Sequence, residues 1–231
     1  MTGRRASAAL IGGITLLERA INYTLGSLHL VTAEAMSYPT PCEDWDLRAL
    51  LVHLDDSLGA LHQAIDVGYV DLAPPAGDGG PARDPVAADR VTGGSMAANS
   101  GAADPVAGDL VAGVRNSASR LLSAWANADD SRDVITIAGG SLTAGLVTGA
   151  GAIEIAVHGW DVAQSCGRHR PIPPSLAEEM FELSVLFVTD ADRPARFAAP
   201  VDVPGLAGPE DRLVAFLGRH PHRPAPDRTG S

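Results

Sequence analysis

Apolar residues recur at three- and four-residue intervals in four separate stretches of the chain, the pattern of helices that bury one face. In the first stretch this pattern includes Leu10, Ile14 and Leu17. Asp46 and Asp104 stand at the start of the second and third stretches and are suited to cap helices there. The pattern favours a mainly all-α protein built on an up-down four-helix bundle. The expected helices span residues 7–34, 46–65, 105–127 and about 141–166.

Residues 67–104 have no sustained apolar period and are rich in Gly, Pro, Asp and Ala. So long a weak stretch inside a domain is typical of a mobile or functional loop, and it is interpreted either as a lid over a site or as a surface loop. Residues 133–138 have β character and are expected to form a short strand or an extended connector. The glycines at 139 and 140 are expected to end it.

A shorter part of the chain follows the fourth helix. Residues 175–189 are expected to form a helix, with Ser175 as its cap and Glu178 as its capping-box partner. Residues 200–209 are expected to be extended or turned, and residues 210–218 to form a last helix. The expected organisation is a bundle in residues 1–170, an extension packed on it in residues 171–221, and a tail in residues 222–231.

The formal net charge is −11, and all 17 basic residues are arginine. A phosphate backbone would be repelled by this charge overall, which argues against nucleic acid as a partner. No run of about 20 apolar residues is present, so a membrane span is not expected. The first helix carries Glu18 and Arg19 and does not resemble a signal peptide. Cys42 and Cys166 are far apart and form no Cys-x-x-Cys pair. Together with the lack of a signal-peptide pattern and of a membrane span, this leads to the expectation of a soluble, reducing, cytoplasmic setting.

Glu154 and His158 lie four residues apart on the fourth helix and project from one face of it. Asp161 lies three residues beyond His158 on the same stripe. A carboxylate and an imidazole one turn apart can bind one metal ion, and His53 of the second helix is the best third ligand. Two alternatives stand beside this one: such spacing is a common accident, and a histidine on a leucine-rich face is often a core residue.

Three motifs bear on this choice. Residues 40–53, TPCEDWDLRALLVH, resemble the signature TPC-x-x-W-x-V-x-x-L-x-x-H of the mycothiol-dependent maleylpyruvate isomerase-type metal-binding family. This family is itself similar to the DinB-like helical bundles. Residues 154–163 resemble its second signature, and residues 197–204 with 211–221 resemble a closing segment of many members. The resemblance covers residues 8–221. It implies a DinB-like bundle with a short C-terminal α/β appendage, and His53, Glu154 and His158 as metal ligands.

A set of two histidines and one carboxylate suits zinc, while nickel, iron or manganese have similar ligand preferences. The resemblance implies mycothiol, an external low-molecular-weight thiol, as co-substrate for an electrophilic or unsaturated small molecule. The reaction would be cis–trans isomerisation or S-transfer. A metal-dependent hydrolase and a non-catalytic metal-binding or sensor bundle remain alternatives. Either a monomer or a homodimer is compatible with the sequence.

Three further residues are candidates for catalysis. Asp161 is expected to hydrogen-bond a ligand histidine or to act as an acid or base. Characterised isomerases of this type carry a larger C-terminal domain that contributes an arginine to the substrate site. Here only about 55 residues follow Pro174, and Arg212 and Arg219 are the candidates for binding an anion. Both cysteines are expected to be small buried hydrophobes rather than nucleophiles.

Further expectations concern residues near the motifs. His62 lies nine residues after His53, about half a turn round the helix, and is expected to face away from the site. His29 is expected to be a surface or packing residue. Trp160 is expected to lie in the core, where its indole N–H needs a partner.

Overall fold

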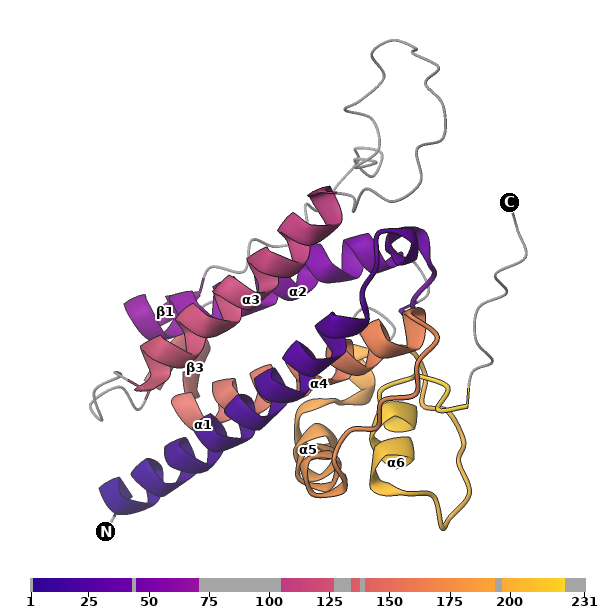
Figure 1. Ribbon diagram of the computed structural model, residues 1–231. Helices are drawn as coiled ribbons and strands as arrows, with labels where there is room; N and C mark the ends of the chain where they lie inside the picture. The colour runs from indigo at the N-terminus through magenta and orange to yellow at the C-terminus, as the bar shows by residue number, and fades with distance from the viewer. Residues whose placement is uncertain are drawn as a thin grey trace, which may run out of the picture.

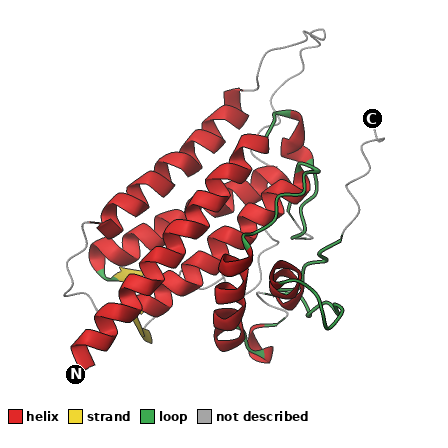
Figure 2. Ribbon diagram, turned by 60° about the horizontal axis from the view of Figure 1, so that its bottom comes forward, coloured by secondary structure: helices red, strands yellow, loops and turns green. Residues whose placement is uncertain are grey.

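Four long helices form the body of the protein in the computed structural model, which describes residues 2–42, 45–70, 105–126, 134–137, 140–193 and 197–222. They lie side by side, as the two views in Figures 1 and 2 agree. The expected helical bundle is therefore confirmed. The four helices are α1 (Thr2–Ser27), α2 (Leu47–Val67), α3 (Pro105–Ala126) and α4 (Ala144–Ser165).

The helices run up, down, down and up. Along α1 and α4 the contacts advance together, from Gly13 beside Thr148 to Thr24 beside Ile155, so these two helices are parallel. Helices α2 and α3 also run in the same direction, as Figure 1 shows. The alternating up-down order expected for the bundle is therefore broken between α2 and α3. A helix of 21 residues such as α2 is about 30 Å long, and residues 71–104 are numerous enough to bridge that length.

The helix ends test the capping expectations. Asp46 caps α2 as expected, because its Oδ1 accepts a hydrogen bond from the backbone N–H of Ala49 at 2.8 Å. Helix α2 ends at Gly68, which has φ +70°, a conformation that favours glycine. Helix α1 ends at Ser27, earlier than expected, and two short 3₁₀ turns follow at Leu28–Leu30 and Glu34–Ser37. The expected cap Asp104 lies outside the described residues.

Three short strands lie at one end of the bundle: β1 (Tyr69–Val70), β2 (Val134–Ile137) and β3 (Gly140–Thr143). Strand β1 pairs parallel to β2, and β2 pairs antiparallel to β3. The strand character expected of residues 133–138 is thus confirmed, whereas β1 was not anticipated. Residues 141–143 were expected to be helical and form β3 instead, because Thr143 is the cap whose side chain accepts from the Leu146 N–H. Residues 71–104, expected to form a loop or lid, lie outside the described residues.

Helix α4 is the central helix and is buried along most of its length. Two glycines allow its neighbours to approach closely. A Cβ on Gly159 would lie 2.9 Å from the Cα of Thr24 on α1. A Cβ on Gly151 would lie 2.7 Å from a methyl group of Leu61 on α2. Because glycine has no side chain at these two positions, α1 and α2 can each pack closely against α4.

The C-terminal part contains α5 (Pro174–Phe187), a 3₁₀ turn (Asp190–Asp192) and α6 (Pro209–Phe216). The expected Ser175 cap is wrong: α5 begins with proline at its first turn, its N-cap is Pro173, and the Ser175 hydroxyl accepts a hydrogen bond from Arg19 instead. No strand is assigned among the described residues of 171–222. The strands β1, β2 and β3 all belong to the part of the chain that forms the bundle, and not to the C-terminal part. None of the described helices is long and apolar enough to cross a membrane.

Trp160 connects this part to the bundle. Its side chain is 1% exposed, and its indole N–H donates to Glu210 Oε1 on α6 at 2.7 Å. The expected buried tryptophan with a hydrogen-bond partner is confirmed. Glu210 Oε2 also accepts from the backbone N–H of Ile172 at 3.0 Å, so one carboxylate joins α4, α6 and the segment between α4 and α5. Of the expected tail, residues 223–231 lie outside the described residues.

Candidate metal centre

One face of α2 lies against one face of α4 in antiparallel directions. His53, Ser57 and Leu61 are four residues apart on α2 and therefore share a face. Ser57 contacts Glu154, and Leu61 lies against Gly151. Helical periodicity thus aligns two polar residues of α2 with the Glu154 and His158 pair of α4.

The three expected metal ligands converge at this contact. His53 Nε2 lies 2.7 Å from Glu154 Oε1, and His158 Nε2 lies 3.2 Å from the same oxygen. The two imidazole rings are nearly perpendicular, with centroids 5.0 Å apart. The side chains of His53 and Glu154 are 36% and 37% exposed, whereas His158 is 7% exposed. The cluster is therefore anchored in the core by His158 and open to solvent on the side of the other two.

The charges of this group support one another. Burial alone would raise the pKa of Glu154, but His158 and His53 outweigh it and hold this pKa well below its usual range. Burial alone would lower the pKa of His158. The negative charge of Glu154 and a hydrogen bond with Asp161 outweigh burial and raise this pKa well above its usual range. The arrangement therefore favours a bound cation, either a proton or a metal ion.

The other nitrogen of His158 faces Asp161. Nδ1 lies 3.0 Å from Asp161 Oδ2, so an Nδ1–H donates to the carboxylate, and Nε2 is the ring nitrogen that faces Glu154 and would bind a metal once it has lost its proton. Asp161 is fully buried, and Arg219 Nη2 donates to the same Oδ2 at 3.1 Å. Burial would raise the pKa of Asp161, but Arg219 and His158 outweigh it and lower this pKa. Arg219 follows α6, so the C-terminal part supplies a charge to the site.

Cys42 also belongs to this cluster, which the sequence interpretation missed. Its Sγ lies 3.4 Å from Asp161 Oδ2 and 4.0 Å from His158 Nδ1, so it is not simply a small buried hydrophobe. Cys42, His158 and Asp161 have the types and spacing of metal ligands. However, Arg219 Nη2 lies 3.2 Å from the sulfur and 3.1 Å from Asp161 Oδ2, where its positive charge opposes a metal ion. The geometry therefore favours the group on the Nε2 side of His158.

Residues 17–163 match the family model described as mycothiol maleylpyruvate isomerase N-terminal domain. The match covers more than half of the chain and includes all three candidate ligands. The chain belongs to this family. Neither the curated proteins nor the solved structures compared with the chain include a match. Membership in the mycothiol maleylpyruvate isomerase N-terminal domain family confirms the resemblance drawn from the motifs.

The candidate ligands of this family member fit a divalent metal ion. His53, Glu154 and His158 each offer one ligand atom, and these atoms lie within 4.8 Å of one another. Ligand atoms bound at about 2 Å to one tetrahedral ion lie roughly 3 to 3.5 Å apart, close to the distances observed here. The donor set of two imidazole nitrogens and one carboxylate is that of catalytic zinc sites with an open position. Trp45 forms one wall, with its ring 4.5 Å from that of His53.

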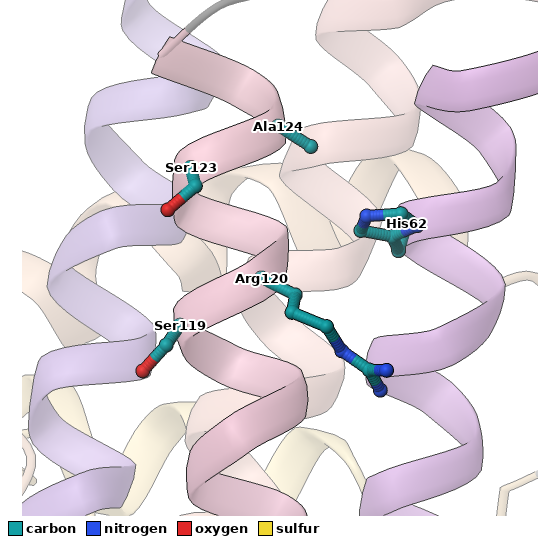
Figure 3. A pocket seen from close by; sticks show the side chains of 5 residues that line it. All are labelled: His62, Ser119, Arg120, Ser123 and Ala124. Atoms are coloured by element: carbon teal, nitrogen blue, oxygen red, sulfur yellow. The ribbon is translucent and has the colours of Figure 1, made fainter.

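The remaining candidates lie elsewhere. Arg212 stacks over the ring of Phe181 at 4.7 Å and is not brought to the cluster. His62 lines a separate pocket of about 390 Å³ between α2 and α3, as Figure 3 shows, and so faces away from the site as expected. His29 is exposed, and its Nδ1 accepts a hydrogen bond from Arg115 Nη2 at 3.1 Å, in agreement with a surface role.

Proposed function

We propose that this protein is a metal-dependent enzyme that uses a low-molecular-weight thiol, mycothiol, on an electrophilic or unsaturated small molecule. In this proposal His53, Glu154 and His158 hold the metal ion, and zinc is the metal their atoms suit best. The reaction is cis–trans isomerisation or S-transfer. A metal bound there would supply a Lewis acid that favours the ionised form of the external thiol.

The observation that carries the proposal is the open side of the three-ligand group. Among the described residues, the candidate ligand group around Glu154 contains three side chains and no fourth. A structural zinc site has four protein ligands, whereas a catalytic one leaves a position for water or substrate. The exposure of His53 and Glu154 provides the route by which a small molecule reaches that position.

Asp161 and Arg219 support the site from behind. Asp161 holds His158 in the tautomer whose Nε2 lone pair is available, and Arg219 keeps Asp161 ionised. The thiol comes from outside the protein in this proposal because Cys42 lies on the Nδ1 side of His158, away from the candidate ligand atoms. Family membership supports mycothiol as that thiol.

The proposal is tested by incubating the zinc-loaded protein with mycothiol and a panel of electrophilic and unsaturated compounds. Products are followed by mass spectrometry for thiol adducts and by chromatography for isomers. We expect turnover that requires both metal and thiol and is lost in His158→Ala. Hydrolysis of ester substrates with no dependence on thiol would instead indicate a metal-dependent hydrolase. Metal binding without any turnover would indicate a binding or sensor protein.

A further inference from the structure

Hydroxyl groups on the helices of this protein commonly donate to the backbone of their own helix. Ser119, Ser165 and Ser184 each donate to the carbonyl four residues earlier, at 2.7 to 3.0 Å. This is the usual way in which a helical serine satisfies its hydrogen. Ser57, in the middle of α2, does not follow this pattern: its hydroxyl donates across to Glu154 on α4 at 3.2 Å.

The acceptor of Ser57 is the oxygen shared by the two histidines. Glu154 Oε1 is the atom that lies 2.7 Å from His53 Nε2 and 3.2 Å from His158 Nε2. The Ser57 Oγ also lies 3.5 Å from His53 Nε2. If His53 is to offer a lone pair to a metal, its Nε2 carries no hydrogen. Without that hydrogen His53 cannot donate to Glu154. The Ser57 hydroxyl is then the neutral group that still donates to the carboxylate and can orient it.

We propose that Ser57 is a positioning residue that fixes the Glu154 carboxylate as a metal ligand. This inference rests on the proposed function, because it requires the three-ligand group to bind metal. The hydroxyl selects which oxygen of Glu154 faces the two imidazoles and restricts rotation of the carboxylate before the ion binds. The side chain of Glu154 is 37% exposed, so part of its surface has no packing that would restrict its rotation.

The expected size of the effect follows from comparable partners in metalloproteins. Removing a hydrogen-bond partner of a metal ligand typically lowers metal affinity or activity by about 10- to 100-fold. Ser57→Ala removes only the hydroxyl and places a good helix former in α2, so the fold is expected to be retained. Ser57→Thr keeps a hydroxyl at the same position. The matched control is Ser119→Ala, which removes a helical hydroxyl that donates within α3.

The experiment measures zinc affinity by competition with a chromophoric chelator, and the visible absorption of the cobalt-substituted protein. We expect Ser57→Ala to weaken zinc binding by about 10- to 100-fold and to change the cobalt spectrum. Ser57→Thr and Ser119→Ala are expected to stay within about threefold of the unsubstituted protein. Equal affinity in Ser57→Ala and the unsubstituted protein would overturn the inference. So would equal losses in Ser57→Ala and Ser57→Thr, because the hydroxyl would then not be the cause.

Failure of the proposed function gives a different result. If the unsubstituted protein binds no zinc, the three-ligand site itself is wrong. If it binds zinc tightly and Ser57→Ala binds equally well, the metal site stands and only the role of Ser57 is wrong.

Discussion

The Nε2 atom of His53 lies 2.7 Å from the Oε1 atom of Glu154, a residue 101 positions further along the chain. Each residue lies on a helix whose register is set independently: α2 by the Asp46 cap and α4 by the Thr143 cap. The close approach of Leu61 to Gly151 brings these helices together on the same face. The pairing of a histidine with a distant carboxylate is thus a consequence of helix packing.

His158 is expected to be indispensable for metal binding. It is the most buried of the three candidate ligands, and two remaining ligands seldom retain a divalent ion. His158→Ala should abolish stoichiometric zinc binding, as measured by elemental analysis of the purified protein. The control is His62→Ala, which alters a histidine on the other side of α2 and should leave metal content unchanged. Equal loss in both variants would mean that the site is assigned to the wrong residues.

Arg219 is expected to contribute to stability because it neutralises a buried charge. Arg219→Ala would leave the fully buried carboxylate of Asp161 without its guanidinium partner. Breaking such a pair typically lowers the free energy of unfolding by about 3 to 5 kcal/mol. Arg212→Ala removes a stacking contact on Phe181 and should cost no more than about 1 kcal/mol. Chemical denaturation of both variants checks this; similar small losses would contradict the buried-pair account.

Gly159 is expected to tolerate no side chain. A Cβ there would lie 2.9 Å from the backbone Cα of Thr24, which cannot move without separating α1 from α4. Gly159→Ala should therefore lower the free energy of unfolding by about 1 to 3 kcal/mol. Gly59→Ala on α2 is the matched control, since nothing lies within 4 Å of its added Cβ, and it should stabilise by about 0.5 to 1 kcal/mol. Thermal denaturation distinguishes these opposite signs; a stabilising Gly159→Ala would refute the close helix contact.

Metal binding is expected to depend on pH through His158. Glu154 and Asp161 raise the pKa of His158 in the metal-free protein, so at neutral pH both of its ring nitrogens are protonated. A metal must then displace the proton on Nε2. Zinc affinity should therefore rise by about tenfold per pH unit for each proton displaced, and fall as the pH is lowered. Calorimetry in two buffers of different ionisation enthalpy measures the protons released. Zinc binding at pH 7 with no proton release would contradict this charge arrangement.

Much of the fold is specified by local sequence signals. The apolar period predicts the four long helices, and Asp46 predicts the start of α2, because both effects act within a few residues. The β3 strand was not predicted because α4 was expected to begin near residue 141, whereas its cap is Thr143. The residues before this cap pair with β2, a contact that the local sequence pattern does not show. The parallel direction of α2 and α3 joins residues far apart in the sequence, and no short-range pattern encodes it.

The site was predictable to a similar extent. Helical spacing places Glu154, His158 and Asp161 on one stripe. Spacing within one helix cannot place His53 beside them; His53 was chosen as the best third ligand on the second helix, and the family motif supported that choice. Cys42 was not predicted as a site residue because it precedes α2 in a non-helical segment, where spacing gives no direction. The available signal was that Cys42 belongs to the same family motif as the candidate ligand His53. Ser57 lies one turn after His53, and its role emerges only from the position of α4.

The most direct test of the account is a titration of the cobalt-substituted protein with mycothiol, followed by visible and near-ultraviolet absorption. His53, Glu154 and His158 are proposed to leave a position at the metal that an external thiol can occupy. We therefore predict that mycothiol produces a saturable sulfur-to-cobalt charge-transfer band, with one thiol per metal, and that His158→Ala shows none. Full cobalt loading with a spectrum that no thiol alters would contradict the central claim.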